Sequence, residues 1–206
     1  MTNTPLAEAV VHVVDDDGAM RRSVVFLAES VGWKAQGHAD AESFLAQLGP
    51  DVVGCLVLDV RMPTMSGLEL QQALNARGAS LPIIFITGHG DVSMAVQAMK
   101  DGAIDFIEKP FKDQVLLDAI AHAVRRSHAA SAQAGEHSRM LQRYEQLTQR
   151  EREIAMRVVR GQSSKVIARE LGISGKTVQV HRTHIMEKMA VHSAAELAHL
   201  LARSKP

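Results

Sequence analysis

The sequence has a single cysteine, Cys55, among its 206 residues, and this excludes a disulfide framework. Such cysteine usage fits a reducing compartment, so we expect a cytoplasmic protein. No apolar run is long enough to span a bilayer, and no basic-then-apolar leader opens the chain. A membrane is therefore not among the expected partners.

The chain also has no net charge, with 23 basic and 23 acidic residues, but the charges are unevenly distributed. Residues 148–206 carry 11 Lys and Arg against 5 Asp and Glu, whereas the rest of the chain carries 12 against 18. This asymmetry indicates two domains with different partners, the basic one being a candidate for nucleic acid binding.

The N-terminal part alternates short apolar segments with segments of helical periodicity. The expected strands are 10–14, 33–38, 56–58, 82–87 and 104–107, and the expected helices are 18–31, 41–48, 66–77, 92–100 and 111–126. This alternation predicts an α/β domain in which a five-stranded parallel sheet carries helices on both faces. Sites in such folds form at the carboxyl ends of the strands.

Five chemically active residues stand at those predicted strand ends. Asp15 and Asp16 follow the first strand, Asp59 the third, Thr87 ends the fourth, and Lys109 follows the fifth. Each has an ordinary explanation when it is taken alone: a helix N-cap, a turn hydroxyl or a solvated loop charge. Their occurrence in the expected order, each after an apolar strand, is harder to explain in that way.

The chemistry of this set indicates phosphoryl transfer. Crowded carboxylates repel one another, and a cation would offset that repulsion. Oxygen ligands without His or Cys favour a hard cation such as Mg²⁺, or Mn²⁺ in its place. A carboxylate beside such an ion can attack a phosphoryl group and form an acyl phosphate, while a hydroxyl and an ammonium group contact the phosphoryl oxygens.

Residues 8–127 resemble the receiver domain of two-component response regulators, which has a flavodoxin-like fold. The matching segments are "VVDDD", "LVLDVRMPTMSGLEL", "IIFITGHGD" and "DFIEKPF". The resemblance implies that a sensor histidine kinase phosphorylates Asp59, and that the domain assists only its own Mg²⁺-dependent phosphorylation and dephosphorylation. It is therefore not expected to be an enzyme in the usual sense.

The same resemblance assigns the other residues of the site. Asp16, Asp59 and the backbone carbonyl of Arg61 would bind the metal, with Asp15 supporting them. Thr87 and Lys109 would contact the phosphoryl group, and the Lys109–Pro110 peptide bond would be cis. Phe106 occupies the aromatic switch position, and since it lacks the hydroxyl of Tyr, a hydroxyl-dependent switch is excluded. Val96 and Lys100 would belong to a dimer face, although Val96 could equally be packed inside its own domain.

The C-terminal part is expected to be helical. Residues 128–146 begin with small and polar residues, which predict a linker that is only partly helical. Helices are then expected at 148–160, with a Thr148–Glu151 capping box, at 163–171, at 175–189 and from 193 onwards. A helix, a glycine turn and a second helix form the helix-turn-helix pattern. The alternative is a plain helical hairpin, which the positive charge of this part disfavours.

The stretch "LTQREREIAMRVVRGQSSKVIARELGISGKTVQVHRTHIMEKMAVHSAAEL" resembles LuxR/NarL-type helix-turn-helix domains. With the receiver it resembles FixJ-type transcription regulators, with a DNA-binding domain at 147–204. The resemblance implies that the 175–189 helix enters the major groove of double-stranded DNA, with Gln179, Val180 and Thr183 facing the bases. The phosphate-contact candidates are polar or basic: Lys165, Lys176, Thr177, His181, Arg182 and Lys188.

The implied partners are the sensor kinase, double-stranded DNA, a second copy of the phosphorylated chain and, as a further candidate, RNA polymerase. The last helix could supply a dimer contact through Ala194, Leu197, Ala198 and Leu201, or these four could be the domain's own core face. Two alternatives to phosphorylation-dependent regulation remain open. The first alternative is a Mg²⁺-dependent phosphatase, but such enzymes usually carry two aspartates two positions apart on the first strand, whereas Asp59 is alone on the third. The second is a receiver that dimerises without phosphorylation, which would not need the complete set of site residues.

Overall fold

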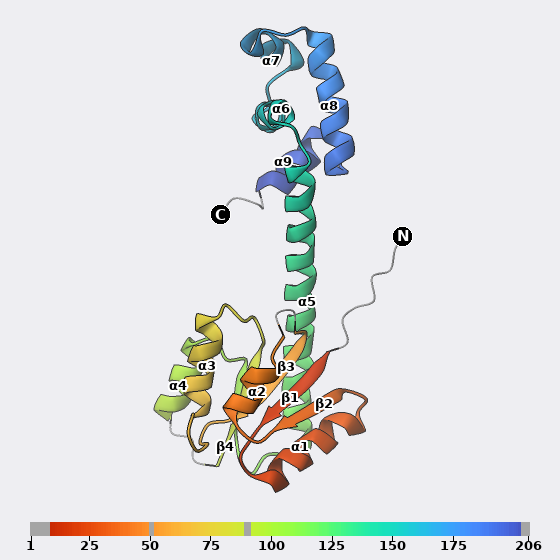
Figure 1. Ribbon diagram of the computed structural model, residues 1–206. Helices are drawn as coiled ribbons and strands as arrows, with labels where there is room; N and C mark the ends of the chain where they lie inside the picture. The colour runs from red at the N-terminus through yellow and green to blue at the C-terminus, as the bar shows by residue number, and fades with distance from the viewer. Residues whose placement is uncertain (1–8, 50–51, 89–91, 203–206) are drawn as a thin grey trace. The chain divides into compact units, whose positions relative to one another are not determined.

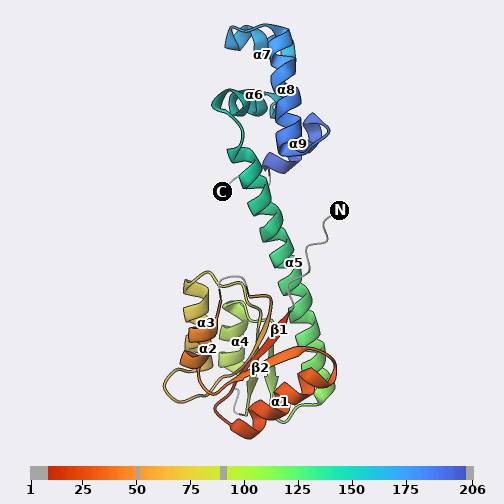
Figure 2. The same cartoon turned by 45° about the vertical axis from the view of Figure 1, so that its right-hand side comes forward.

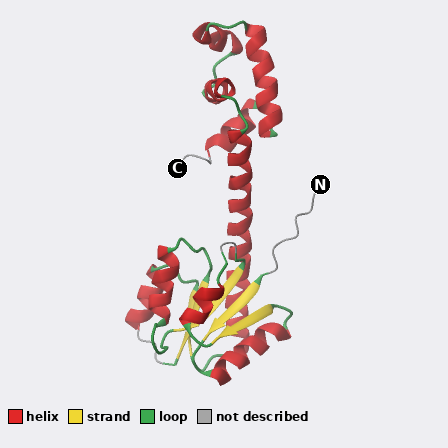
Figure 3. Cartoon of the chain, viewed as in Figure 1, coloured by secondary structure: helices red, strands yellow, loops and turns green. Residues whose placement is uncertain are grey.

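The computed structural model describes residues 9–49, 52–88 and 92–202. The chain divides into two compact units between residues 132 and 133, within one long helix (Figure 1). The first unit is an α/β domain. The second consists of helices joined by turns (Figure 3).

The first unit is built on a five-stranded parallel sheet with the strand order β2-β1-β3-β4-β5. Its strands are β1 Val10–Val14, β2 Lys34–His38, β3 Gly54–Asp59, β4 Ile83–Thr87 and β5 Asp105–Glu108. This is the flavodoxin-like order, in which the chain reverses direction across the sheet between β1 and β3. The predicted fold class is confirmed. The third strand is longer than predicted, because it begins at Gly54 rather than Leu56.

Helices cover both faces of the sheet (Figures 1 and 2). One core joins alternate residues of β1, such as Val11 and Val13, to α1 Gly18–Ser30 and α5 Asp113–Glu145. The other core joins Val14, Leu56 and Phe85 to the helices of the opposite face. Those helices are α2 Ala41–Gln47, α3 Gly67–Ala76 and α4 Val92–Lys100. Burial on both faces explains why β3 and β4 are apolar throughout.

The α5 helix corrects the prediction of a partly helical linker at residues 128–146. The helix continues without interruption from Asp113 to Glu145. The segment contains four alanines between residues 129 and 134, and alanine is the strongest helix former. A single glycine, Gly135, costs only about 1 kcal/mol in a helix interior, so it does not end the helix.

The second unit contains α6 Gln149–Val159, α7 Ser164–Leu171, α8 Gly175–Met189 and α9 Ala194–Ala202. The Thr148–Glu151 capping box opens α6, as the sequence predicts. Gly172 ends α7 in the left-handed conformation with φ 64°, and Ser174 caps α8, so the predicted glycine turn is present. No described helix has the length and apolar character needed to cross a membrane.

Candidate functional site

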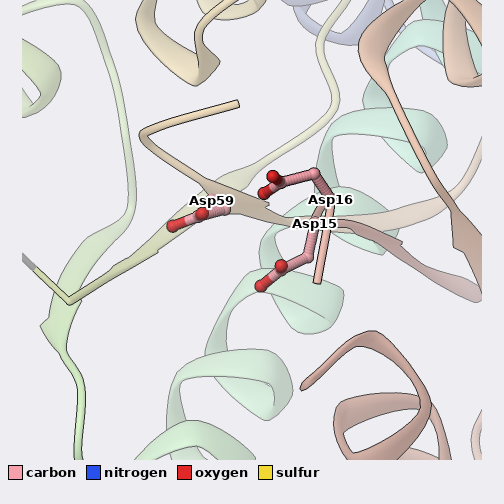
Figure 4. A group of neighbouring side chains, drawn as sticks. All are labelled: Asp15, Asp16 and Asp59. Carbon is pink, nitrogen blue, oxygen red and sulfur yellow. The ribbon is translucent and has the colours of Figure 1, made fainter. Parts of the chain in front are cut away.

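Three carboxylates gather at the carboxyl edge of the sheet. Asp15 and Asp16 follow β1, and Asp59 ends the neighbouring strand β3 (Figure 4). One ligand oxygen from each lies within 4.8 Å of those of the other two. Asp15 and Asp59 are buried, whereas Asp16 is exposed. The parallel sheet therefore brings together the acidic residues that the sequence singled out.

Lys109 joins this cluster from the end of β5. Its Nζ lies 2.9 Å from Oδ2 of Asp15 and 3.5 Å from Oδ1 of Asp59. The backbone N–H of Lys109 donates to the carbonyl of Thr87 at 2.7 Å, which fixes the end of β5 beside the end of β4. The Lys109–Pro110 peptide bond is cis, in agreement with the resemblance.

The environment of Asp59 disfavours its ionised form. Burial is the largest effect and raises the pKa of Asp59, and the nearby carboxylate of Asp15 acts in the same direction. The ammonium group of Lys109 and the N–H of Val60, which donates to Oδ1 at 3.0 Å, only partly offset this. A bound cation would favour the ionised form, so the oxygen-only cluster fits a hard divalent metal.

Three aspartates in a row, Asp15, Asp16 and Asp17, follow β1, and they do not share one role. Asp17 caps α1, because its Oδ1 accepts from the N–H groups of Ala19 at 2.8 Å and Met20 at 3.3 Å. Asp15 instead faces the cluster, and its Oδ1 also accepts from the N–H of Asp17 at 2.9 Å. The ordinary explanation as a helix cap is thus right for the third aspartate alone.

The remaining predicted receiver residues lie around this edge. Thr87 is buried at the end of β4, one residue beyond Ile86, which pairs with Asp59. Phe106 is half-buried on β5, with its ring centroid 6.1 Å from that of Phe85. Arg61 lies exposed in the loop after β3, and the role of its carbonyl stays a prediction.

Gly67 supports the site and was missed by the sequence analysis. A Cβ at this position would collide with the backbone carbonyl oxygen of Asp59. Its N–H donates to the carbonyl of Val60 at 2.9 Å, which draws the start of α3 against the end of β3. The glycine itself was the available signal, because glycine is the residue that allows a close approach of one backbone to another.

The proposed dimer face is accessible on α4. Val96 is 46% exposed and Lys100 is exposed, so Val96 is not packed inside its own domain. The structure describes one copy of the chain, and the role of these residues in dimerisation stays a prediction.

In the second unit, α8 presents its polar side outward. Val178, Ile185 and Met189 are buried in the core, whereas Gln179, Val180 and Thr183 are exposed on the other side. Val180 is an apolar side chain with 48% exposure. A hollow of about 680 Å³ follows this side of α8 towards the start of α9, and Gln179 and Thr183 line it. The three predicted base-facing residues thus share an accessible surface.

The predicted phosphate contacts fall into three groups. Three are exposed: Lys165, Lys176 and Thr177. His181 and Arg182 are half-buried. Lys188 differs, because its Nζ lies 2.7 Å from Oε2 of the buried Glu151, a pairing within the domain that the sequence analysis missed. Of the four residues considered on α9, Leu197 is fully buried and belongs to the core.

A flavodoxin-like domain with an acidic site at its carboxyl edge, followed by a helix-turn-helix domain, defines a two-component response regulator. Residues 11–121 match the response regulator receiver domain, and residues 145–201 match the bacterial regulatory proteins of the luxR family. The chain therefore belongs to the response regulators that combine a receiver with a LuxR-type DNA-binding domain, which are regulators rather than classical enzymes.

Similar proteins cover nearly the whole chain. The transcriptional regulatory protein FixJ of Azorhizobium caulinodans is 47% identical over 92% of this chain and 90% of its own length. The solved structure of the response regulator StyR matches with a TM-score of 0.89 and 44% identity, covering 96% of this chain and all of that one. Full-length FixJ from B. japonicum matches with a TM-score of 0.58 and 41% identity, covering 96% and 97% of the two chains.

Proposed function

We propose that Asp59 accepts a phosphoryl group from a sensor histidine kinase, and that phosphorylation promotes dimerisation and promoter binding. The observation that carries this proposal is the convergence of Asp15, Asp16, Asp59 and Lys109 at one edge of the sheet. The family supports it, because the chain combines a receiver with a DNA-binding domain.

The chemical step is a displacement at phosphorus. Oδ1 of Asp59 accepts the N–H of Val60 and faces Lys109, so Oδ2 is the oxygen that we propose as nucleophile. The new oxygen–phosphorus bond forms as the nitrogen–phosphorus bond of the donor phosphohistidine breaks. The donor imidazole leaves with the electron pair and takes up a proton from solvent. Lys109, which is already at the site, would then contact the phosphoryl oxygens together with Thr87.

The metal ligands in this proposal are Asp16, Asp59 and the backbone carbonyl of Arg61, with Asp15 supporting them. A bound Mg²⁺ or Mn²⁺ supplies positive charge for the phosphoryl oxygens. Asp16 is exposed, so it can exchange solvent for an ion without breaking buried contacts. Asp15 is held by Lys109 and by the N–H of Asp17, which suits a supporting role.

Phosphorylation is expected to act on the face formed by α4 and β5. Thr87 and Phe106 lie at or near the strand ends that border this face. Val96 and Lys100 are exposed residues of α4, the helix of the same face. A phosphoryl group that draws Thr87 towards Asp59 would open space for the Phe106 ring, so that the surface around α4 changes. A second phosphorylated copy would bind there.

The DNA-binding unit would then read the promoter through α8. Gln179 can pair with adenine in the major groove, and Val180 or Thr183 can touch a thymine methyl group. Lys165, Lys176, Thr177, His181 and Arg182 are the proposed phosphate contacts. Lys188 is left out of this set because Glu151 already holds its ammonium group. RNA polymerase is a further proposed partner.

Mass spectrometry tests the phosphoryl acceptor. The purified chain is incubated with acetyl phosphate and Mg²⁺, and we expect the mass of one phosphoryl group to be added. Asp59→Asn should abolish the addition, and Asp16→Asn should weaken Mg²⁺ binding. Asp17→Asn is the matched control, because asparagine is also a good N-cap and Asp17 caps α1. An addition that survives Asp59→Asn rules out Asp59 as the acceptor.

A further inference from the structure

The α4 helix has little apolar packing. Among its described residues only Ala98 is buried and Met94 is partly buried against the core, while Val92 is 81% exposed and Val96 and Met99 are each 46% exposed. The neighbouring helix α3 buries Leu70, Gln71 and Leu74. Because burial of apolar surface is the main force that holds a helix to its domain, α4 depends more than α3 on other contacts.

Two side-chain amides of α3 reach the C-terminal end of α4. Nε2 of Gln71 donates to the carbonyl of Ala98 at 3.0 Å, and Nδ2 of Asn75 donates to the carbonyl of Asp101 at 2.9 Å. Residues 71 and 75 lie one turn apart on the same side of α3. The carbonyl of Ala98 also accepts the N–H of Ala103 at 3.0 Å, so the Gln71 amide adds a second bond to it. A carbonyl oxygen has two lone pairs and can accept both bonds.

Gln71 is an unusual choice for a position that is 1% exposed. Its Oε1 is buried and accepts no hydrogen bond from the described part of the chain. A half-satisfied buried amide is unfavourable compared with an apolar side chain of the same shape. Stability of the core therefore does not account for glutamine here, whereas a role at α4 does.

We propose that Gln71 and Asn75 are positioning residues that hold the C-terminal end of α4 in its unphosphorylated place. The proposal rests on the proposed function, because it assigns to these amides the resistance that phosphorylation must overcome at the α4 face. A hollow of about 220 Å³ borders both residues as well as Asp101, Gly102 and Ile104, so the turn after α4 has room to shift.

The direction of the effect follows from population shift. A bond that exists only in the unphosphorylated arrangement favours that arrangement by its own net free energy. Removing the bond makes the alternative arrangement more accessible without phosphorylation. Since a net hydrogen bond is modest, the expected change in the equilibrium is roughly 2- to 10-fold.

The main experiment compares Gln71→Met with Gln72→Met in the full chain. Both changes replace glutamine by methionine on α3, but Gln72 is exposed. We expect Gln71→Met to keep the rate of phosphorylation by acetyl phosphate and the thermal stability. Its unphosphorylated dimer should be roughly 2- to 10-fold tighter by sedimentation, with a correspondingly smaller gain on phosphorylation. A purely structural role of Gln71 would move thermal stability and leave this ratio unchanged.

Hydrogen exchange separates this proposal from the proposed function. The N–H groups of Asp101, Gly102 and Ala103 bond to carbonyls of α4, so their exchange reports on its C-terminal end. In the unphosphorylated chain we expect exchange roughly 2- to 10-fold faster in Gln71→Met than in Gln72→Met. If phosphorylation does not change dimerisation even in the wild type, the proposed function fails. The exchange result still shows whether Gln71 holds the C-terminal end of α4.

Asn75→Ala is the second variant, because Asn75 is exposed and its replacement leaves the core intact. It should speed exchange at the same three N–H groups. The proposal is overturned if Gln71→Met and Asn75→Ala both match Gln72→Met in exchange. Should Gln71→Met fail to fold, Asn75→Ala alone decides between the two outcomes.

Discussion

The ammonium group of Lys109 lies 2.9 Å from Oδ2 of Asp15, a pairing of residues 94 positions apart in the sequence. The carboxylate that would support a metal ion is thus already neutralised in part by the cation that would contact the phosphoryl group. A metal ion must compete with Lys109 for the negative charge of the cluster.

Lys109→Met is therefore expected to strengthen Mg²⁺ binding while it weakens phosphorylation. Loss of the ammonium group removes repulsion of the dication, and we expect affinity to rise roughly tenfold, or about 1.4 kcal/mol. Calorimetric titration measures the affinity, and mass spectrometry after acetyl phosphate treatment measures phosphorylation. Lys112→Met, at an exposed lysine three residues away, is the control. Unchanged Mg²⁺ affinity in Lys109→Met would contradict this account of the cluster.

Glu151 gives the DNA-binding unit an acid-sensitive contact. Burial alone would raise the pKa of Glu151, but bonds from Lys188 and from the N–H of Thr148 outweigh it and lower the pKa from 4.5 to about 2. The folded state thus favours the ionised form. The resulting stabilisation is present above about pH 4.5 and is lost as the pH falls towards 2.

Glu151→Gln should remove this pH-dependent part of the stability. The shift in the pKa of Glu151 sets an upper limit of about 3 kcal/mol on this stabilisation. The actual value is smaller, because solvent screens the partly exposed Lys188 side chain. Denaturant unfolding followed by circular dichroism at pH 6 and pH 3 compares the two chains. The wild type should lose more stability than Glu151→Gln over this interval, and equal losses would count against the pairing with Lys188.

A buried histidine pair makes the receiver sensitive to acid in a higher range. Nδ1 of His12 lies 3.2 Å from Nε2 of His38, and both rings pack against Phe44. Burial first, and then the charge of His38, lowers the pKa of His12 from 6.5 to about 4. Between pH 6.5 and pH 4 the His12 imidazole is protonated in the unfolded chain and neutral in the folded chain. The free energy of unfolding therefore falls as the pH drops through this range.

Between pH 7.5 and pH 5 the titration of His12 is expected to lower the free energy of unfolding by about 2 kcal/mol. His12→Gln should show a smaller loss. Trp33 is the single tryptophan of the chain and packs against the receiver core, so its fluorescence reports unfolding of this unit. His122→Gln changes an exposed histidine of α5 and should retain the acid sensitivity of the wild type.

The dimer face can be tested by charge. Val96→Asp combined with Lys100→Asp should leave phosphorylation intact and weaken the phosphorylated dimer at least about tenfold, because like charges would meet across the interface. Sedimentation of the phosphorylated chain measures this. Val31→Asp with Lys34→Asp makes the same changes at exposed positions remote from α4 in the sequence, and this variant should dimerise normally. An unchanged dimer in the α4 variant would refute the proposed face.

The features that the sequence predicted correctly depend on neighbouring residues. Apolar runs located the strands, and because parallel strands end at one edge, they also located Asp15 and Asp59 together. The capping box at Thr148 was predictable because its partner, Glu151, is three residues away.

The features that the sequence did not predict depend on partners far along the chain. No residue close to Lys188 in the sequence indicates that it pairs with Glu151. Likewise, no residue close to Gln71 indicates that its amide donates to the carbonyl of Ala98. The continuation of α5 was missed for a different reason. The small and polar residues of this segment indicate a linker, whereas the alanines among them favour a helix.

The way in which α8 reads DNA gives the last prediction, which separates two classes of contact. Lys176→Ala or Arg182→Ala should weaken binding to all sequences alike and lower the salt dependence by roughly 1 per lost phosphate contact. Fluorescence anisotropy with specific and unrelated DNA over a range of salt concentrations measures both. His184→Ala, at an exposed residue of α8 outside the proposed set, is the control.

Gln179→Ala should instead change which base pair is preferred, because its exposed amide is proposed to pair with a base edge. The expected loss of discrimination is about 1–3 kcal/mol at the base pair that Gln179 contacts. In the structure Oε1 of Gln179 accepts from the hydroxyl of Ser164 at 3.3 Å, a contact to α7 that would hold the amide in place. Ser164→Ala should therefore weaken the same preference to a smaller degree. Selection from random DNA by the phosphorylated chain tests this, and a motif that Gln179→Ala leaves unchanged would show that another side of α8 faces the bases.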